Sequence, residues 1–199
     1  LQNYIEKIFE PNNGTVGIMD LETGGLLAMV SKPNFNPESF TGTLDPKIWN
    51  QLITDPAKPL HNKFLQGLYL PGSTFKILMA LAALQEGEVD TTTISKCFGR
   101  IRSPDRYFHC WNRSGHGAMD IYDALKNSCN IYFYRLGMRM DIDLIAKYAG
   151  MMGFGSKSGI DSTNEKKGLF PTKAWKQKSL NQKWYPGETI SVSIGGGMM

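Results

Sequence analysis

Residues 70–87 read LPGSTFKILMALAALQEG, and this stretch decides the fold. Leu70-Pro71-Gly72 forms a turn, and Gly87 stands where a glycine commonly ends a helix, so the sequence predicts one helix that starts at Ser73. Apolar residues recur every three to four positions, and Ile77 and the alanines extend them almost all round the helix. A helix of this kind is expected to be buried in the centre of a domain.

Ser73 and Lys76 lie three residues apart in the first turn of this helix, and therefore on one face. A serine hydroxyl is a poor nucleophile at neutral pH, and a lysine can serve as its base only when the lysine pKa is lowered. Burial and the positive end of the helix dipole both lower that pKa. The pair is a candidate nucleophile and base. The alternative is that Ser73 caps the helix and Lys76 faces solvent.

A second hydroxyl and an amide lie at a predicted helix junction. Residues 120–127 predict a short helix, and Ser128 and Asn130 directly precede an apolar helix that starts at Ile131 and is expected to end at Gly137. In a cleft shared with the helix lysine, the hydroxyl can relay a proton and the amide can hold the lysine or a substrate amide. Both residue types also favour helix junctions as caps, so this pattern alone is weak.

Three cysteines and one histidine form a possible set of metal ligands. Three thiolates and an imidazole are typical of a closed structural zinc site. The spacing Cys-x12-Cys-x5-His-x12-Cys matches no short zinc-finger pattern, however, and by itself favours one disulfide plus a buried thiol, or three ordinary buried cysteines. The four residues are Cys97, Cys110, His116 and Cys129.

The residues before this region indicate an α+β chain. Residues 1–9 have a helical apolar period, and residues 15–21 and 26–30 predict a hairpin. Residues 31–59 predict a long surface excursion with one short helix at 47–53.

Composition excludes several classes of protein. With 199 residues and 41% apolar content, the chain is long enough to build a core. The net charge of +4 comes from basic residues that are not clustered, which argues against nucleic-acid binding. The longest apolar run, residues 77–84, is less than half of the roughly 18 residues that a membrane span needs.

Together these motifs resemble the active-site serine penicillin-recognising enzymes, whose signature is Ser-x-x-Lys, Ser-x-Asn and then Lys-Thr-Gly. PLHNK at 59–63, GLYLPGSTFK at 67–76, GHG at 115–117 and WYPGETISVSIG at 184–195 resemble the class B penicillin-binding proteins, and among them the elongation-specific D,D-transpeptidases. The resemblance covers essentially the whole chain. It implies an α+β fold with helices packed on an antiparallel sheet, which these residues leave incomplete.

The resemblance implies acyl transfer on peptidoglycan stem peptides. Ser73 would attack the penultimate D-Ala carbonyl with Lys76 as its base, and an amine of a neighbouring strand would accept the acyl group. Ser128 would shuttle the proton, and Asn130 would align the lysine and the substrate. β-Lactams would mimic the D-Ala-D-Ala end and acylate the serine. Catalysis would need no metal or organic cofactor.

The same resemblance raises the expectation of zinc. Members of the family can carry a structural zinc beside the active site, and its ligand positions match the cysteine and histidine set above. Cys129 stands between Ser128 and Asn130, so a bound zinc would hold this segment in place. Thiolates bound to zinc also resist pairing in an oxidising periplasm.

The third motif of the family is expected after residues 191–195, and it is not found there. The residues Lys157-Ser158-Gly159 match the letters of this motif. The glycine-rich sequence around them is unsuited to a central strand, so we expect a loop there. The resemblance therefore implies a partial transpeptidase domain, without the membrane anchor, the pedestal and the C-terminal part, and such a fragment is a candidate for inactivity. The end Gly196-Gly197-Met198-Met199 also departs from the expected Gln-Gly.

The resemblance implies an inner-membrane protein with its catalytic domain in the periplasm, and a SEDS-type glycan polymerase and the elongation machinery as partners. A serine β-lactamase would share the fold, but no glutamate is identifiable as its water-activating base. A β-lactam sensor domain would be acylated without transpeptidation. A nucleic-acid-binding zinc module would leave the serine helix unexplained.

Overall fold

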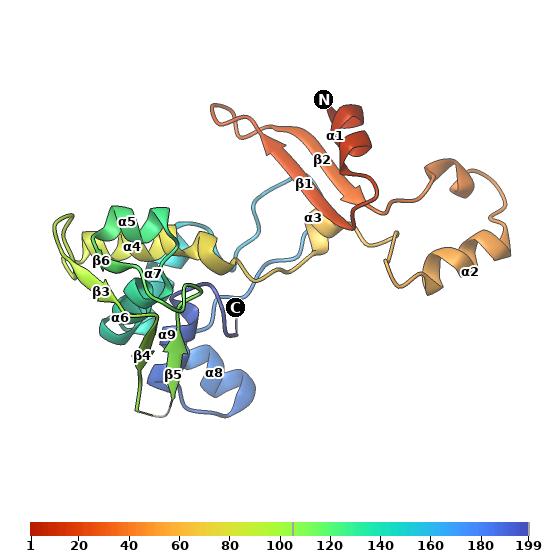
Figure 1. Ribbon diagram of the computed structural model, residues 1–199. Coiled ribbons are helices and arrows are strands. Elements are labelled where there is room, and N and C mark those ends of the chain that lie inside the picture. Colours follow the sequence, from red (N-terminus) through yellow and green to blue (C-terminus); the bar gives the residue numbers. More distant parts are fainter. Residues whose placement is uncertain (105, 199) are drawn as a thin grey trace. The chain divides into compact units, whose positions relative to one another are not determined.

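The computed structural model describes residues 1–104 and 106–198, and the chain divides into two compact units (Figure 1). Unit 1 consists of Leu1–Leu68 and Gly159–Lys166, and unit 2 of Tyr69–Ser158 and the residues from Lys167 onward. Met199, the last residue of the unusual end, lies outside the described residues.

Unit 1 has the predicted order of a helix, a hairpin and a long excursion with short helices. The predicted strands and the helix at 47–53 are confirmed to within two residues at each end. The elements are α1 (Gln2–Phe9), β1 (Gly14–Met19), β2 (Leu26–Lys32), the 3-10 helix η1 (Pro37–Phe40), α2 (Pro46–Thr54) and α3 (Lys63–Gln66).

The hairpin organises unit 1. Strands β1 and β2 pair antiparallel, with Gly14 opposite Lys32. Helix α1 packs on β2, where the Gln2 side chain donates to the carbonyl of Met29 at 3.0 Å and accepts from its N–H at 2.9 Å. Helix α3 also contacts both strands.

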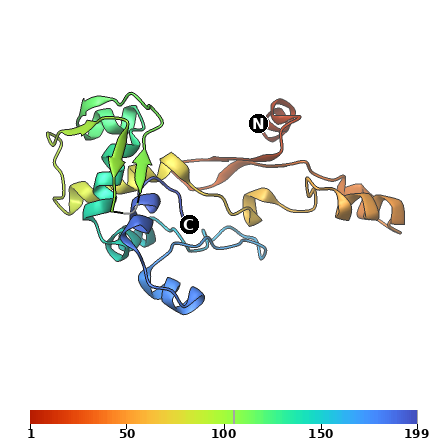
Figure 2. The same cartoon turned by 60° about the horizontal axis from the view of Figure 1, so that its bottom comes forward.

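Unit 2 is mainly helical (Figure 2). Helices α5, α6 and α7 all contact α4. In the described part of the chain, no helix is long and apolar enough to cross a membrane. The helices are η2 (Gly72–Thr74), α4 (Phe75–Gln85), α5 (Ile121–Lys126), α6 (Asn130–Arg139), α7 (Ile142–Met151), α8 (Lys173–Leu180) and α9 (Pro186–Val192).

Helix α4 differs from the prediction in two ways. The residues from 72 to 74 form a 3-10 turn before the α-helix starts at Phe75. The helix is largely buried, as expected, but one face is open, because Ile77 is 63% exposed and Leu81 is 47% exposed. The two lie four residues apart on one helix face, whereas Met79 and Ala83, on the opposite side of the helix, are buried.

The prediction that Gly137 ends its helix is also wrong, because α6 continues to Arg139. The glycine is buried where α6 packs on α9. A Cβ at this position would lie 2.8 Å from the Cβ of Ser193 and 3.0 Å from the carbonyl oxygen of Thr189. The residue therefore allows a close helix contact and does not act as a cap.

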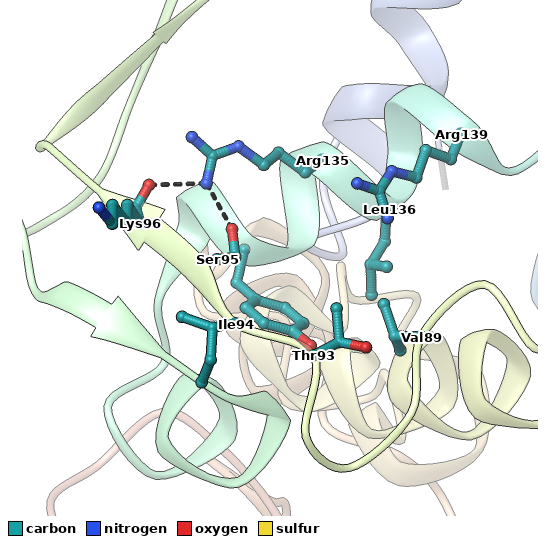
Figure 3. A pocket seen from close by; sticks show the side chains of 9 residues that line it. Val89, Thr93, Ile94, Ser95, Lys96, Arg135, Leu136 and Arg139 are labelled. Carbon is teal, nitrogen blue, oxygen red and sulfur yellow. Dashed lines mark hydrogen bonds between the residues drawn. The ribbon is translucent and has the colours of Figure 1, made fainter.

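Four short strands, which the sequence did not predict, surround the cysteines. They are β3 (Ser95–Cys97) paired with β6 (Gly117–Met119), and β4 (Arg100–Arg102) paired with β5 (Tyr107–His109). Arg135 of α6 donates to the Ser95 hydroxyl and to the Lys96 carbonyl of β3 (Figure 3). Residues 157–159 are irregular, which agrees with the rejection of a strand there.

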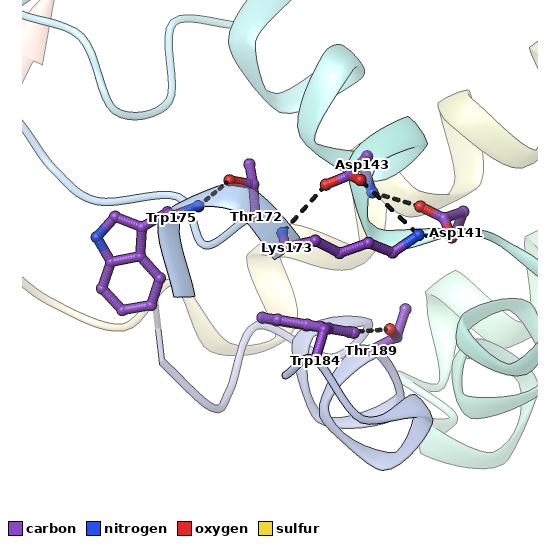
Figure 4. A network of polar contacts seen from close by, with 7 residues as sticks. All are labelled: Asp141, Asp143, Thr172, Lys173, Trp175, Trp184 and Thr189. Atoms are coloured by element: carbon purple, nitrogen blue, oxygen red, sulfur yellow. Dashed lines mark hydrogen bonds and ion pairs between the residues drawn. The ribbon is translucent and has the colours of Figure 1, made fainter. Parts of the chain in front are cut away.

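A polar network holds α8 to α7 (Figure 4). The Lys173 ammonium forms an ion pair with Asp141 and lies 3.8 Å from a carboxylate oxygen of Asp143, whose other oxygen accepts from the Lys173 N–H at 3.2 Å. Lys176 is 2% exposed and forms an ion pair with Glu188 of α9. These lysines therefore join three consecutive helices.

We predict opposite effects of alanine at two helical glycines. Gly137→Ala gains about 1 kcal/mol of helix propensity but forces a contact in a packed interface at a cost of about 1–3 kcal/mol, so the free energy of unfolding falls. Gly150→Ala on α7 is the control, since nothing lies within 4 Å of its Cβ, and should raise that free energy by up to about 1 kcal/mol. Urea denaturation measures both, and a stabilised Gly137→Ala would contradict the close packing.

Candidate active site and cysteine cluster

Ser73 lies in the 3-10 turn η2 and is exposed. The turn starts at Gly72, whose φ of +55° lies in the left-handed region that favours glycine. The N–H of Gly72 donates to the carbonyl of Gly195 at 3.0 Å, and a Cβ on Gly195 would lie 1.9 Å from the Gly72 oxygen. The backbone after α9 therefore holds the turn that carries Ser73.

Lys76 is buried and fully hydrogen-bonded. Its side chain is 1% exposed, and its ammonium has three N–H donors. Nζ donates to the Ser128 carbonyl at 2.8 Å, to the Ser128 hydroxyl at 3.0 Å and to Oδ1 of Asn130 at 2.7 Å. The structure thus brings together three of the four predicted catalytic residues, Lys76, Ser128 and Asn130. Lys76 lies about one helical turn after the fourth, Ser73.

The backbone between α5 and α6 presents these acceptors. Ser128 has φ +49°, a left-handed conformation that is uncommon for a residue other than glycine. Its N–H donates to the Leu125 carbonyl at 3.0 Å, and the next N–H, of Cys129, donates to the Ala124 carbonyl at 2.9 Å. Asn130 donates through Nδ2 to the carbonyl of His109 at 3.4 Å, which links the junction to β5.

Burial lowers the pKa of Lys76 to about 8, and nearby cysteine sulfurs only partly oppose this effect. The ring of Phe133 lies 5.6 Å from Nζ and forms part of its apolar surroundings. With a pKa of about 8, roughly a tenth of the lysine is a neutral amine at pH 7. Lys76 is therefore poised to accept a proton.

The cysteines and His116 form a compact cluster. The four candidate ligand atoms lie within 4.8 Å of one another, and all three cysteines are buried free thiols. The sulfurs of Cys97 and Cys110 each lie 3.6 Å from Nδ1 of His116. A tetrahedral zinc with bonds of about 2.1–2.3 Å separates its ligand atoms by about 3.5–3.8 Å, so these residues fit the metal. Burial raises the pKa of Cys129 to about 12, and a divalent cation would offset this effect.

His109, which neighbours Cys110 in the sequence, lies on β5 and is exposed. It is outside the cluster of metal-ligand candidates found among the described residues. The set of Cys97, Cys110, His116 and Cys129 that the sequence analysis proposed is thus the set that the structure brings together.

The comparison with family models decides what the chain is. A model described as the penicillin binding protein transpeptidase domain matches residues 14–199. The chain belongs to this family. Its α+β fold, with helices and antiparallel strands, agrees with the predicted fold class.

Relatives and solved structures agree with this assignment. The chain is 36% identical over 199 residues to the Escherichia coli peptidoglycan D,D-transpeptidase MrdA. The aligned region covers 99% of this chain and 31% of MrdA. It matches PBP2 of Pseudomonas aeruginosa, solved with WCK 5153, with a TM-score of 0.95 and 36% identity over 99% of this chain and 45% of the other. PBP2 of Helicobacter pylori, solved with MreC, gives a TM-score of 0.95 and 34% identity over 98% and 37%. The chain therefore spans about a third of the length of MrdA.

The sequence analysis missed two features around the site. Gly195 was quoted as part of a motif, but no role was given to it. Its carbonyl accepts a hydrogen bond from the N–H of Gly72, which lies 123 positions earlier in the sequence. The sequence analysis also missed Trp111, whose indole N–H donates to the carbonyl of Asn127 at 3.0 Å, directly before the junction. Neither feature had a local signal in the sequence.

We predict that Lys76 titrates near pH 8. Because the folded protein releases this proton at lower pH than the unfolded chain does, the unfolded chain binds more protons between about pH 8 and pH 10.4, and the free energy of unfolding rises with pH in this window. NMR of the lysine side chains measures the pKa, and Lys76→Met assigns the resonance and removes the pH dependence. A pKa near 10 would contradict the account of a desolvated lysine.

Proposed function

We propose that the chain is the serine-bearing part of a peptidoglycan D,D-transpeptidase that cross-links stem peptides during cell elongation and is acylated by β-lactams. The observation that carries this proposal is the buried Lys76 ammonium, held by Ser128 and Asn130 one turn after Ser73. The name of the E. coli relative supports the same reaction.

In the proposed reaction, neutral Lys76 accepts the proton of the Ser73 hydroxyl, and the serine oxygen bonds to the carbonyl carbon of the penultimate D-Ala. The N–H of Ser73 supplies one hydrogen bond to the oxyanion. The peptide bond then breaks, and the proton passes through Ser128 to the amine of the departing terminal D-Ala. An amine of a second strand attacks the ester carbonyl, the bond to the Ser73 oxygen breaks, and the proton lost by the amine passes through Lys76 to that oxygen, which completes the cross-link.

Asn130 has two hydrogen bonds that suit a positioning role. Its Oδ1 accepts from Lys76, and its Nδ2 donates to the His109 carbonyl over a longer distance of 3.4 Å. The weaker of the two contacts is the one that a substrate carbonyl can replace. We therefore assign Asn130 to holding both the lysine and the backbone of the stem peptide.

We also propose that Cys97, Cys110, His116 and Cys129 bind one structural zinc ion. When bound, zinc would compensate the charge of the thiolates and fix the backbone at Cys129. The neighbours of that cysteine, Ser128 and Asn130, hold the proposed base. Loss of the metal should therefore loosen the acceptors of Lys76 without removing any group that takes part in the chemistry.

The proposed substrate lies outside the cytoplasmic membrane, so we place this domain in the periplasm of a protein anchored in the inner membrane. The solved complex of H. pylori PBP2 with MreC supports a partner from the elongation machinery. A SEDS-type glycan polymerase is the second proposed partner, because cross-linking requires newly made glycan strands.

The acyl-enzyme is tested by intact-mass spectrometry of the complete gene product that contains these residues, with and without penicillin. We expect one covalent adduct, which Ser73→Ala abolishes and Ser114→Ala, a change at another exposed serine of unit 2, retains. An adduct that survives Ser73→Ala, or none on the folded native protein, would contradict the proposal. Rapid turnover of nitrocefin would indicate a β-lactamase instead.

The zinc site is tested by native mass spectrometry and metal analysis. We expect one zinc ion per chain, lost in His116→Ala and retained in His109→Ala, which changes a histidine outside the cluster. Because the metal site adjoins the acceptors of Lys76, His116→Ala should also slow acylation by about tenfold or more. Equal zinc contents in the two variants would exclude the proposed ligand set.

A further inference from the structure

A polar cavity lies in unit 2, away from the candidate active site. It has a volume of about 310 Å³ and lies between β3, the segment that precedes it, and α6 (Figure 3). Its apolar lining includes Val89, Ile94 and Leu136. The polar lining consists of Thr93, Ser95, Lys96, Tyr132, Arg135 and Arg139.

The geometry of α6 separates this cavity from the active site. At about 100° per residue, Tyr132, Arg135 and Arg139 lie within about 60° of one another around the helix axis. Asn130, which contacts Lys76, lies about 140–180° away from them on the same helix. The cavity is therefore on the opposite side of α6, and the proposed reaction does not use it.

Three basic residues line the cavity, and no carboxylate forms an ion pair with them in the described part of the chain. They are Lys96, Arg135 and Arg139. Arg135 donates to the hydroxyl of Ser95 and to a carbonyl of β3, and Arg139 donates to the Glu88 carbonyl at 3.4 Å. These acceptors are neutral, so the charges remain available to an anion.

A buried donor completes the set. Tyr132 is 3% exposed, and its hydroxyl is one of the buried polar atoms without a hydrogen-bond partner among the described residues. An unpaired buried hydroxyl costs about 1–3 kcal/mol, so it calls for an explanation. Burial and the charges of Asp120 and Asp90 raise the pKa of Tyr132, although Arg139 opposes them, so the hydroxyl stays protonated and can donate.

We propose that this cavity binds a phosphate group, with Arg139 and Arg135 as charged donors and Tyr132 as a neutral donor. A phosphate monoester carries a charge of about −1.5 to −2 at pH 7, which two guanidinium groups can balance. A guanidinium group can also donate two parallel hydrogen bonds to two oxygens of one phosphate group. The apolar lining fits a small organic substituent on the phosphate, from either a lipid headgroup or a soluble phosphate ester.

Isothermal titration calorimetry of the full chain with inorganic phosphate and with glycerol 3-phosphate tests the site. We expect Arg139→Gln to weaken binding by about tenfold, because a charge-assisted hydrogen bond is lost, and Tyr132→Phe by about fivefold. Tyr132→Phe removes only an unpartnered hydroxyl, so the variant should fold, and circular dichroism checks this. Arg113→Gln, which changes an exposed arginine outside the cavity by the same charge, should bind as the native chain does.

A sedimentation assay with phosphatidylglycerol vesicles, and with phosphatidylcholine vesicles as the control, distinguishes the two sources. Binding to the anionic vesicles that Arg139→Gln and Tyr132→Phe both weaken identifies a lipid headgroup, and binding only to soluble phosphates identifies an ester. Absence of both, up to about 10 mM phosphate, would overturn the proposal. So would binding that Tyr132→Phe leaves unchanged. Neither result bears on acylation of Ser73.

Discussion

A buried ammonium group constrains the centre of unit 2. Lys76 is 1% exposed, and a buried charge is costly unless hydrogen bonds compensate it. All three of its hydrogen bonds go to one short segment, because Ser128 provides two acceptors and Asn130 the third. Formation of this part of the core therefore requires α4 and the α5–α6 junction to meet in a single arrangement.

The same segment connects the candidate active site to the cysteine cluster. Ser128 and Asn130 contact Lys76, whereas the residue between them, Cys129, belongs to the cluster of candidate metal ligands. The left-handed backbone at Ser128, with φ +49°, is part of this arrangement. The candidate active site and the cysteine cluster therefore share the segment from Ser128 to Asn130.

Local sequence patterns predicted the hairpin, the helix at 47–53 and the helices that carry Lys76 and Asn130, and long-range contacts account for part of what they missed. The three-residue spacing of Ser73 and Lys76 is a local property, and a helix there followed from the turn before it. The role of Gly137 depends on its contact with α9, which is distant in sequence, so local reasoning took it for a helix end. The exposure of Ile77 likewise depends on which elements pack around α4.

The same distinction between local sequence patterns and long-range contacts applies to the candidate site. Ser-x-x-Lys, Ser-x-Asn and the four metal-ligand candidates were predicted because their residue types and the family resemblance pointed to them. The hydrogen bond of Gly72 to Gly195 and the cavity around Tyr132 have no local signature. Both arise where segments that are distant in the sequence meet, so only the structure could reveal them.

The dependence of this centre on the lysine and its acceptors is tested most directly by a double-mutant cycle on the free energy of unfolding. Lys76→Met and Asn130→Ala are measured singly and together by urea denaturation at pH 7. If the buried ammonium and Asn130 stabilise each other, the two changes are non-additive, with a coupling of about 2 kcal/mol. Additive effects would show that the contact does not hold the site together and would contradict the account.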